Sequence, residues 1–314
     1  MALCQTAGNP PAYCVVCYWG HRMDHANRLN GKSASDKPVD DESASSHPAI
    51  VTTAPRCGIA FMAKASAPGR AKTRLVPPLT FEEAAVLNTA FLQDVADNVL
   101  QAARDGDRGI AGYAAYGPPG SEDFFRRTLP GAIGLIGAWR PNFGDCLLHT
   151  IEEIFARGHA SAVVLNSDSP TLPTAYLVET AAALARPGDR AVLGPSSDGG
   201  YYLLGLKRAY RRVFEGIAWS TEEVAQQTLA RAAEIGLPVH TLPIWYDVDD
   251  ITSLQRLFAE FTDGMDLMDG LQRYAAEHSR ARIRALLNDR KLAVVFSAAP
   301  AREGPCIRQR QVLG

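Results

Sequence analysis

The chain has 314 residues, of which 46% are hydrophobic and 21% are charged, and its formal net charge is −2. This composition is ordinary for a globular protein and offers no basic excess for nucleic acid or an anionic membrane. Six scattered cysteines are too few for a disulfide framework, and no apolar run reaches the roughly 18 residues of a membrane span. We therefore expect a cytoplasmic protein that acts on small molecules, with no nucleic-acid and no membrane partner.

The two ends of the chain differ from its middle. Residues 1–55 are rich in Ser, Asp, Lys and Pro with almost no apolar period, which predicts a disordered tail, and residues 297–314 give the same prediction. Between the tails we predict a folded domain over residues 56–262 and a helical extension over residues 263–296.

Both outer segments contain candidate binding features. The first tail has the ligand types of a zinc site, although little core surrounds them: Cys14, Cys17, His21 and His25. The extension has apolar residues that can pack against the domain or against a second subunit in a homodimer: Leu267, Leu271, Tyr274, Ile283 and Leu287.

Strand and helix patterns alternate along the middle of the chain. Short apolar runs predict strands at 58–63, 110–116, 132–138, 161–166, 190–196, 200–207 and 238–248. Amphipathic periods predict helices at 80–103, 145–158, 175–185, 221–236 and 251–261. This alternation predicts an α/β fold with a mostly parallel sheet covered on both faces. Ligands of such folds bind beyond the carboxyl ends of the strands.

Two helices begin with the pattern of a capping box. These are Thr80 with Glu83, and Ser220 with Glu223. Trp219 comes directly before the second box, where it is either a core residue or a platform for a ligand.

An aspartate follows the strand at 161–166 in the stretch "VVLNSDSPTLP". Asp168 therefore lies at the carboxyl end of a buried strand, where this class of fold places its site. It either binds a ligand there or accepts hydrogen bonds from the turn that follows it.

A basic loop, "KASAPGRAKTRL", follows the first strand. Lys64, Arg70, Lys72 and Arg74 occur in it without an acid, and Gly69 allows close backbone approach. The loop suits phosphate oxygens, or it is an ordinary solvated surface. It has no P-loop spacing, and the chain has no G-x-G-x-x-G motif, which disfavours a dinucleotide oxidoreductase.

A second acidic group follows the last predicted strand in "WYDVDD". Asp247 and Asp249 alternate, so that on a strand both would point to one face, while Asp249 or Asp250 caps the helix near Ile251. Asp168 and one of the alternating pair can share a Mg²⁺ ion, which prefers oxygen ligands and bridges carboxylates to phosphates.

A glycine turn in "LGPSSDGGYYLLGL" predicts a hairpin. Gly199 and Gly200 permit the positive φ that a hairpin turn needs. Such a turn would direct Asp198 into the same cleft, and Tyr201 or Tyr202 could pack on a ring there.

Five ordered motifs carry a resemblance to a known family: "FMAKASAPGRAKTRL", "NSDSPTLP", "LGPSSDGGYYLLGL", "FEGIAWSTEEV" and "DVDD". Over about residues 57–257 the chain resembles a family of bacterial proteins of once unknown function. Its members are described as radical-SAM-associated or arsenosugar-biosynthesis glycosyltransferases. They are similar to GT-A glycosyltransferases and to nucleotidyltransferases, so the resemblance implies a three-layer α/β/α GT-A-type nucleotide-diphospho-sugar transferase fold.

The resemblance also implies roles for residues of these motifs. Phosphates would be bound by the basic loop: Lys64, Gly69, Arg70, Lys72 and Arg74. A Mg²⁺ or Mn²⁺ ion would be held by carboxylates: Asp168, Asp247 and Asp249. Asp198 would be the catalytic carboxylate on the acceptor side, and the substrate would contact Gly199, Gly200, Tyr201 and Trp219.

The chain departs from the family pattern at two places. Asn166 replaces the first aspartate of the Asp-x-Asp pair that GT-A enzymes often show, so metal binding there rests on Asp168 alone. Asn142 and His149 occur where the family usually has Gln and Arg, which leaves the acceptor contacts open.

These features predict a transferase that uses a nucleotide-activated substrate. The first hypothesis is glycosyl transfer from a nucleotide-diphospho-sugar to a small-molecule acceptor. The second is nucleotidyl transfer from a nucleoside triphosphate to a phosphate or phosphonate. The third is a non-catalytic GT-A-like domain that only binds a nucleotide.

Overall fold

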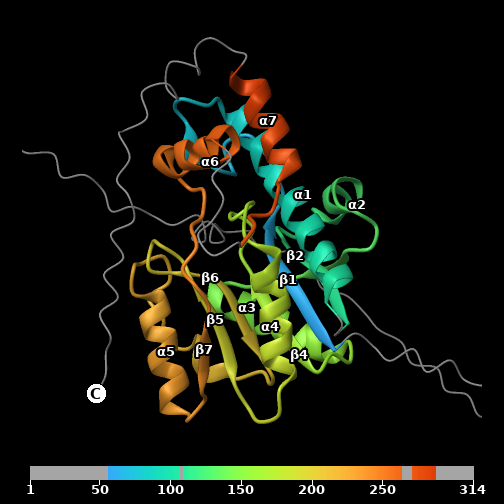
Figure 1. Ribbon diagram of the computed structural model, residues 1–314, viewed down its shortest axis with the longest axis vertical. Helices are drawn as coiled ribbons and strands as arrows, with labels where there is room; N and C mark the ends of the chain where they lie inside the picture. The colour runs from blue at the N-terminus through green and yellow to red at the C-terminus, as the bar shows by residue number, and fades with distance from the viewer. Residues whose placement is uncertain (1–55, 107–108, 264–270, 288–314) are drawn as a thin grey trace, which may run out of the picture.

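A seven-stranded sheet forms the centre of the structure, a computed structural model that describes residues 56–106, 109–263 and 271–287 (Figure 1). The strands are β1 (Cys57–Lys64), β2 (Ile110–Gly117), β3 (Gly134–Gly137), β4 (Ser161–Leu165), β5 (Ala191–Pro195), β6 (Tyr201–Leu206) and β7 (Val239–Thr241). Their order across the sheet is β3-β2-β1-β4-β6-β5-β7.

Among these seven strands only β6 runs against its neighbours. It pairs antiparallel with β4 and with β5, while the pairs β1–β2, β1–β4, β2–β3 and β5–β7 are all parallel. The reason is local: a short turn over residues 196–200 joins β5 to β6, and such a turn can join only antiparallel strands. The prediction of a mostly parallel sheet is confirmed.

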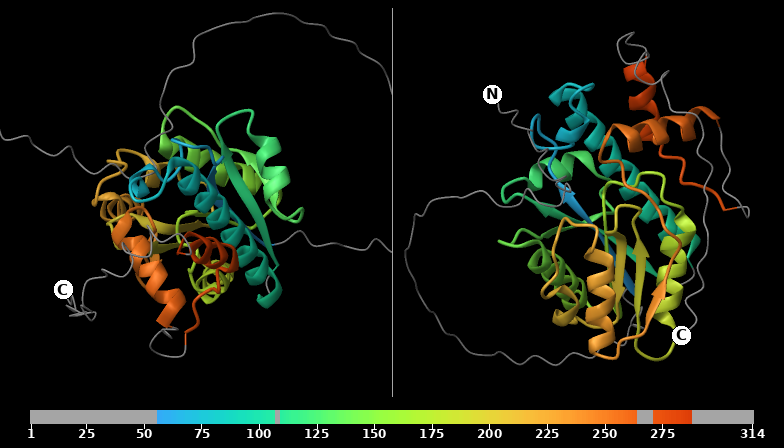
Figure 2. Two further views of the ribbon diagram at one scale, coloured as in Figure 1. Left: turned by 90° about the horizontal axis from the view of Figure 1, so that it is seen from above. Right: turned by 90° about the vertical axis from the view of Figure 1, so that its left-hand side faces the viewer.

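Helices cover both faces of the sheet (Figures 1 and 2). They are α1 (Phe81–Asp105), α2 (Glu122–Thr128), α3 (Phe143–Ala156), α4 (Thr174–Ala185), α5 (Val224–Glu234), α6 (Ile251–Asp263) and α7 (Glu277–Leu287). Alternate residues of β1 separate the two cores: Ile59 and Phe61 pack in the cluster with α1 and α4, and Ala60 packs in the cluster with α3 and α5. The fold is therefore a three-layer α/β/α arrangement of the GT-A type, as predicted.

Two local predictions are wrong. The strand predicted over 238–248 is continuous only at Val239–Thr241, and Trp245 forms a separate bridge with Ser196. Pro243 lacks the amide hydrogen that an unbroken ladder between them would need. The Ser220 capping box does not form. Ser220 has a φ of 73°, and Glu223 rather than Ser220 takes the position before the first residue of α5.

The helical extension packs on α1. The side chain of Asp94, on the buried face of α1, accepts hydrogen bonds from the backbone N–H groups of His278 (3.0 Å) and Ser279 (2.7 Å). It thereby satisfies N–H groups in the first turn of α7, while Ile283 enters the core. Leu267 and the four candidate zinc ligands lie outside the described residues. Within the described residues, no helix has the length and apolar character needed to span a membrane.

Candidate active site at the carboxyl edge of the sheet

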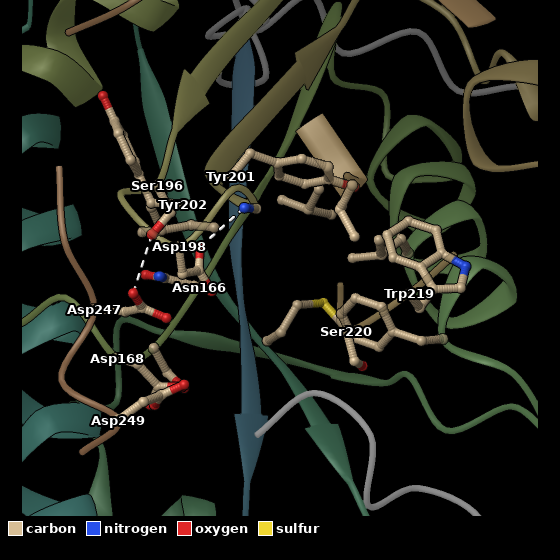
Figure 3. A pocket seen from close by; sticks show the side chains of 18 of the residues that line it. Asn166, Asp168, Ser196, Asp198, Tyr201, Tyr202, Trp219, Ser220, Asp247 and Asp249 are labelled. Carbon is tan, nitrogen blue, oxygen red and sulfur yellow. Dashed lines mark hydrogen bonds between the residues drawn. The ribbon is translucent and has the colours of Figure 1, made fainter. Parts of the chain in front are cut away.

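A cleft that is open to solvent lies at the carboxyl edge of the sheet (Figure 3). It is lined by residues from the ends of β1 and β4, from the β5–β6 turn and from the segment after β7. This is the location that the strand order predicts for a ligand. Its acidic side chains come from three separate segments: Asp168, Asp198, Asp247 and Asp249.

A buried lysine joins two of these carboxylates. The Lys72 ammonium nitrogen lies 2.7 Å from Asp168 Oδ1 and 3.0 Å from Asp249 Oδ1, and it donates to the Val248 carbonyl oxygen at 2.8 Å. Lys72 is 1% exposed. Its backbone is left-handed, with a φ of 51°, at the start of the short turn Thr73–Leu75. The loop therefore turns this side chain into the protein and not toward solvent.

The charges of this group stabilise one another. Burial alone would lower the pKa of Lys72, but the attraction and the hydrogen bonds of Asp168 and Asp249 raise it above its ordinary value, so the ammonium keeps its proton. Burial raises the pKa of Asp168, Lys72 opposes that rise, and the neighbouring charge of Asp249 adds to it.

Helix α6 decides which acid of "DVDD" is available for the site. Asp250 Oδ1 accepts from the backbone N–H of Ser253 at 2.8 Å, so Asp250 caps the helix. Asp249 is then left to bind Lys72. This confirms that one of these two aspartates is a cap.

Asp247 is a third carboxylate at the cleft, and it is half-buried. Its Oδ1 accepts from the Ser196 hydroxyl at 3.0 Å. Burial, followed by the charges of Asp249, Asp198 and Asp168, raises the pKa of Asp247 to about 7. Without a cation beside it, this carboxylate therefore keeps its proton to a higher pH than an ordinary aspartate does.

The β5–β6 turn directs Asp198 into the cleft. Asp198 Oδ1 accepts from the backbone N–H of Gly200 at 2.9 Å. Gly199 has a φ of 90°, and a Cβ built on it would lie 2.1 Å from the backbone oxygen of Glu222. The carbonyl oxygen of Gly199 accepts a hydrogen bond from the backbone N–H of Ala225 at 2.9 Å. Gly199 therefore allows the turn to pack directly on the start of α5, while Gly200 lines the cleft.

The side of the cleft across from the carboxylates is apolar (Figure 3). Its walls are Met62, Phe143, Leu147, Tyr201, Trp219 and Val224. The rings of Phe143 and Trp219 meet edge to face, with centroids 5.2 Å apart. Within the described part of the chain, two buried polar atoms on cleft-lining residues have no hydrogen-bond partner: Tyr201 Oη and Asn166 Oδ1. Trp219 is thus both part of a packed aromatic pair and a lining residue.

The basic loop contributes less to the cleft than its sequence suggests. Of its predicted phosphate ligands only Lys64 is a lining residue. Burial and the nearby charge of Arg70 lower the pKa of Lys64. Arg70 and Gly69 are exposed, and Arg74 Nη2 is buried without a partner away from the lining. The structure therefore places Lys64 at the cleft and the other four predicted phosphate ligands outside its lining.

Helix α1 supplies a cleft residue that sequence reasoning missed. Asn88 lines the cleft, and its amide nitrogen donates to the Ser66 hydroxyl at 2.8 Å and to the Lys64 carbonyl at 3.4 Å. It holds the basic loop in place. The sequence signal that could have identified Asn88 is a polar residue on the apolar face of an amphipathic helix. Asn142, by contrast, caps α3 by accepting from the N–H of Asp145, and neither it nor His149 lines the cleft.

The carboxylates at the cleft are ligands that a divalent cation prefers, but they do not lie close enough together to hold one by themselves. Carboxylates are the hard oxygen ligands that Mg²⁺ and Mn²⁺ prefer. Yet no three His, Cys, Asp or Glu residues in the described ranges are grouped closely enough to hold an ion. Asp168, Asp247 and Asp249 would hold one only together with oxygen atoms of a substrate.

Comparisons with known proteins agree with this fold. A family model described as "Uncharacterized protein conserved in bacteria (DUF2064)" matches residues 93–221. A search of curated proteins finds no match. A crystal structure from Desulfovibrio desulfuricans G20, of a protein provisionally described as a nucleotide-diphospho-sugar transferase, is 26% identical. The match covers 76% of this chain and 98% of that one, with a TM-score of 0.64.

Two more distant structures also match. Glucosyl-3-phosphoglycerate synthase from Mycobacterium tuberculosis is 12% identical, with a TM-score of 0.41 and coverage of 74% and 79% of the two chains. A cytidylyltransferase from Leptospira borgpetersenii is 11% identical, with a TM-score of 0.42 and coverage of 79% and 99%.

Proposed function

We propose that the protein is a glycosyltransferase that uses a nucleotide-diphospho-sugar and a divalent cation. The observation that carries this proposal is the division of the cleft into a carboxylate side and an aromatic side. Lys64 is the only basic residue among the described residues that line the cleft. One lysine and a metal suit a single diphosphate, whereas the apolar wall suits an uncharged ring. The likeness to the Desulfovibrio protein supports the same class of donor.

The carboxylate side is assigned to the leaving group. Asp168, Asp247 and Asp249 would hold the cation, and Lys64 would contact the diphosphate. A bound divalent ion would neutralise the charge that develops on the leaving diphosphate. These roles place the anomeric carbon of the sugar between the carboxylates and the aromatic wall.

Asp198 is assigned to the acceptor. Its carboxylate would take the proton of the attacking hydroxyl, whose oxygen forms a bond to the anomeric carbon while the bond to the diphosphate oxygen breaks. Gly200 follows Asp198 in the turn, and Tyr201 and Trp219 belong to the apolar wall across from the carboxylates. We assign these residues to contacts with the sugar and the acceptor, with Gly199 supporting the turn.

A second candidate is nucleotidyl transfer from a nucleoside triphosphate. The exposed Arg70, whose charge acts on Lys64, favours it, because a triphosphate with a phosphate acceptor needs more cationic donors than Lys64 supplies. The association with radical-SAM proteins and arsenosugars stays a prediction from the sequence motifs.

A thermal-shift panel separates these functions. The protein is heated with nucleoside triphosphates and with nucleotide sugars, each with and without Mg²⁺ or Mn²⁺. A ligand at 100 times its dissociation constant stabilises the folded state by about 2.7 kcal/mol. We expect metal-dependent stabilisation by a nucleotide sugar. Stabilisation by triphosphates alone would favour nucleotidyl transfer, and no response to any nucleotide would contradict both.

A further inference from the structure

The position of Lys72 differs from that of a lysine that binds substrate phosphate. Its two carboxylate partners, Asp168 and Asp249, line the cleft, but Lys72 itself is not a lining residue. Its side chain is 0% exposed, while those of the partners are 15% and 13% exposed. Lys72 therefore lies behind the two carboxylates, on the side away from the ligand.

The hydrogen-bonding capacity of Lys72 is already used. An ammonium group has three N–H donors. Asp168, Asp249 and the carbonyl of Val248 accept at 2.7, 3.0 and 2.8 Å. A substrate phosphate would have to displace one of these partners from a buried position. Each carboxylate, in contrast, contacts Lys72 through Oδ1 and has a second oxygen.

We propose that Lys72 is a positioning residue that orients Asp168 and Asp249 and cancels one of their two charges. The pair then presents a reduced negative charge to the cleft. A divalent cation alone binds weakly to such a pair, because affinity for hard cations rises with the number of anionic ligands. Tight binding requires the phosphate oxygens of the nucleotide. This inference rests on the proposed nucleotide-dependent function and adds an order of binding to it: the cation binds tightly only when the nucleotide is bound.

The decisive experiment measures binding of Mn²⁺ alone by electron paramagnetic resonance, in the wild-type protein and in Lys72→Met. Methionine keeps the length of the side chain and removes its charge. We expect Lys72→Met to bind Mn²⁺ without nucleotide at least 10-fold more tightly than the wild type. Millimolar Mn²⁺ should also raise the melting temperature of the variant more than that of the wild type. A purely structural role for Lys72 would produce no gain in Mn²⁺ affinity.

Two controls test whether charge is the cause. Lys72→Arg keeps a buried cation, so its Mn²⁺ affinity should stay within about 3-fold of the wild type, well inside the tenfold step. Lys207→Met removes a lysine whose ammonium instead binds the carbonyls of Arg186 and Gly188, and it should not change Mn²⁺ binding. Unchanged or weaker Mn²⁺ binding by folded Lys72→Met would overturn the proposal.

The proposal stays testable if Lys72→Met does not fold without metal. Refolding by Mn²⁺ alone would then support it, because the uncompensated carboxylates would be stabilised by the ion. Failure of Mn²⁺ to refold the variant, with the double variant Lys72→Met/Asp249→Asn folded, would overturn it. The Mn²⁺ measurements contain no nucleotide. If no nucleotide binds to the wild type, the proposed function fails, while the Mn²⁺ result still decides the role of Lys72.

Discussion

The substitution Asp168→Asn separates ligand binding from folding. It removes one anionic oxygen at the cleft and keeps the shape of the side chain. If Asp168 holds the cation that neutralises the diphosphate, metal-dependent nucleotide affinity should fall at least tenfold, about 1.4 kcal/mol. Metal-independent binding should change little.

The effect of Asp168→Asn on stability follows from its contact with Lys72. A hydrogen bond to a charged group contributes about 1.5 to 3 kcal/mol net, and Asp168 makes one of these at 2.7 Å. Asparagine can still accept from Lys72, and removal of the charge relieves the repulsion between Asp168 and Asp249. Lys72 also keeps Asp249 and the Val248 carbonyl. We therefore expect a loss of less than about 2 kcal/mol in the free energy of unfolding without ligands.

Urea denaturation of the ligand-free protein and titration calorimetry with nucleotide, with and without Mn²⁺, measure the two quantities. Asp250→Ala is a matched control, because Asp250 caps α6 and does not line the cleft. It should cost about 1 kcal/mol of stability and leave affinity unchanged. A destabilised Asp168→Asn protein with wild-type metal-dependent affinity would refute the assignment of Asp168 to the cation.

Three further predictions concern Gly199, Asp247 and Asp94. Gly199→Ala should lower the free energy of unfolding by on the order of 3 kcal/mol, because the new Cβ would meet the backbone of Glu222. Gly120→Ala is the control: Gly120 has a similar φ of 82° but nothing within 4 Å of a built Cβ, so the loss should be about 1 kcal/mol. Urea denaturation measures both losses. Because the folded-state pKa of Asp247 is raised to about 7, its contribution to ligand-free stability is present at pH 4 and lost as the pH rises through 7. Subtracting the pH–stability curve of Asp247→Asn measures that loss, and Mn²⁺ affinity should rise over the same interval; a flat difference curve would contradict it. Asp94→Ala should lower the free energy of unfolding by about 1 to 3 kcal/mol and speed amide hydrogen exchange in α7. Unchanged exchange in α7 would argue against the role of Asp94 in binding the first turn of that helix.

The parts of the fold that depend on local sequence were predictable. The apolar runs place β1 and β4 within one or two residues of their observed bounds. The Thr80 capping box forms as predicted: the hydroxyl accepts from Glu83 N–H at 3.1 Å, and the Glu83 carboxylate accepts from Thr80 N–H at 2.7 Å. Such signals need only a few neighbouring residues.

Long-range partners were not predictable from one sequence. A lysine in a basic loop is usually solvated, and nothing in its neighbours indicates the carboxylate 177 positions away that it meets in the fold. Asn88 and Asp94 read as minor interruptions of an apolar helix face. In the fold, Asn88 binds the loop after β1, and Asp94 binds the start of α7.

The placement of Lys72 also explains how four carboxylates can share one cleft. Burial and each additional negative charge raise the free energy of an ionised carboxylate, and together they raise the pKa of Asp247. A mobile lysine in the cleft would relieve this repulsion but would also fill the space that the diphosphate and its cation need. A lysine fixed behind Asp168 and Asp249 relieves part of the repulsion without taking that space. The remaining negative charge is then left for a cation that arrives with the nucleotide.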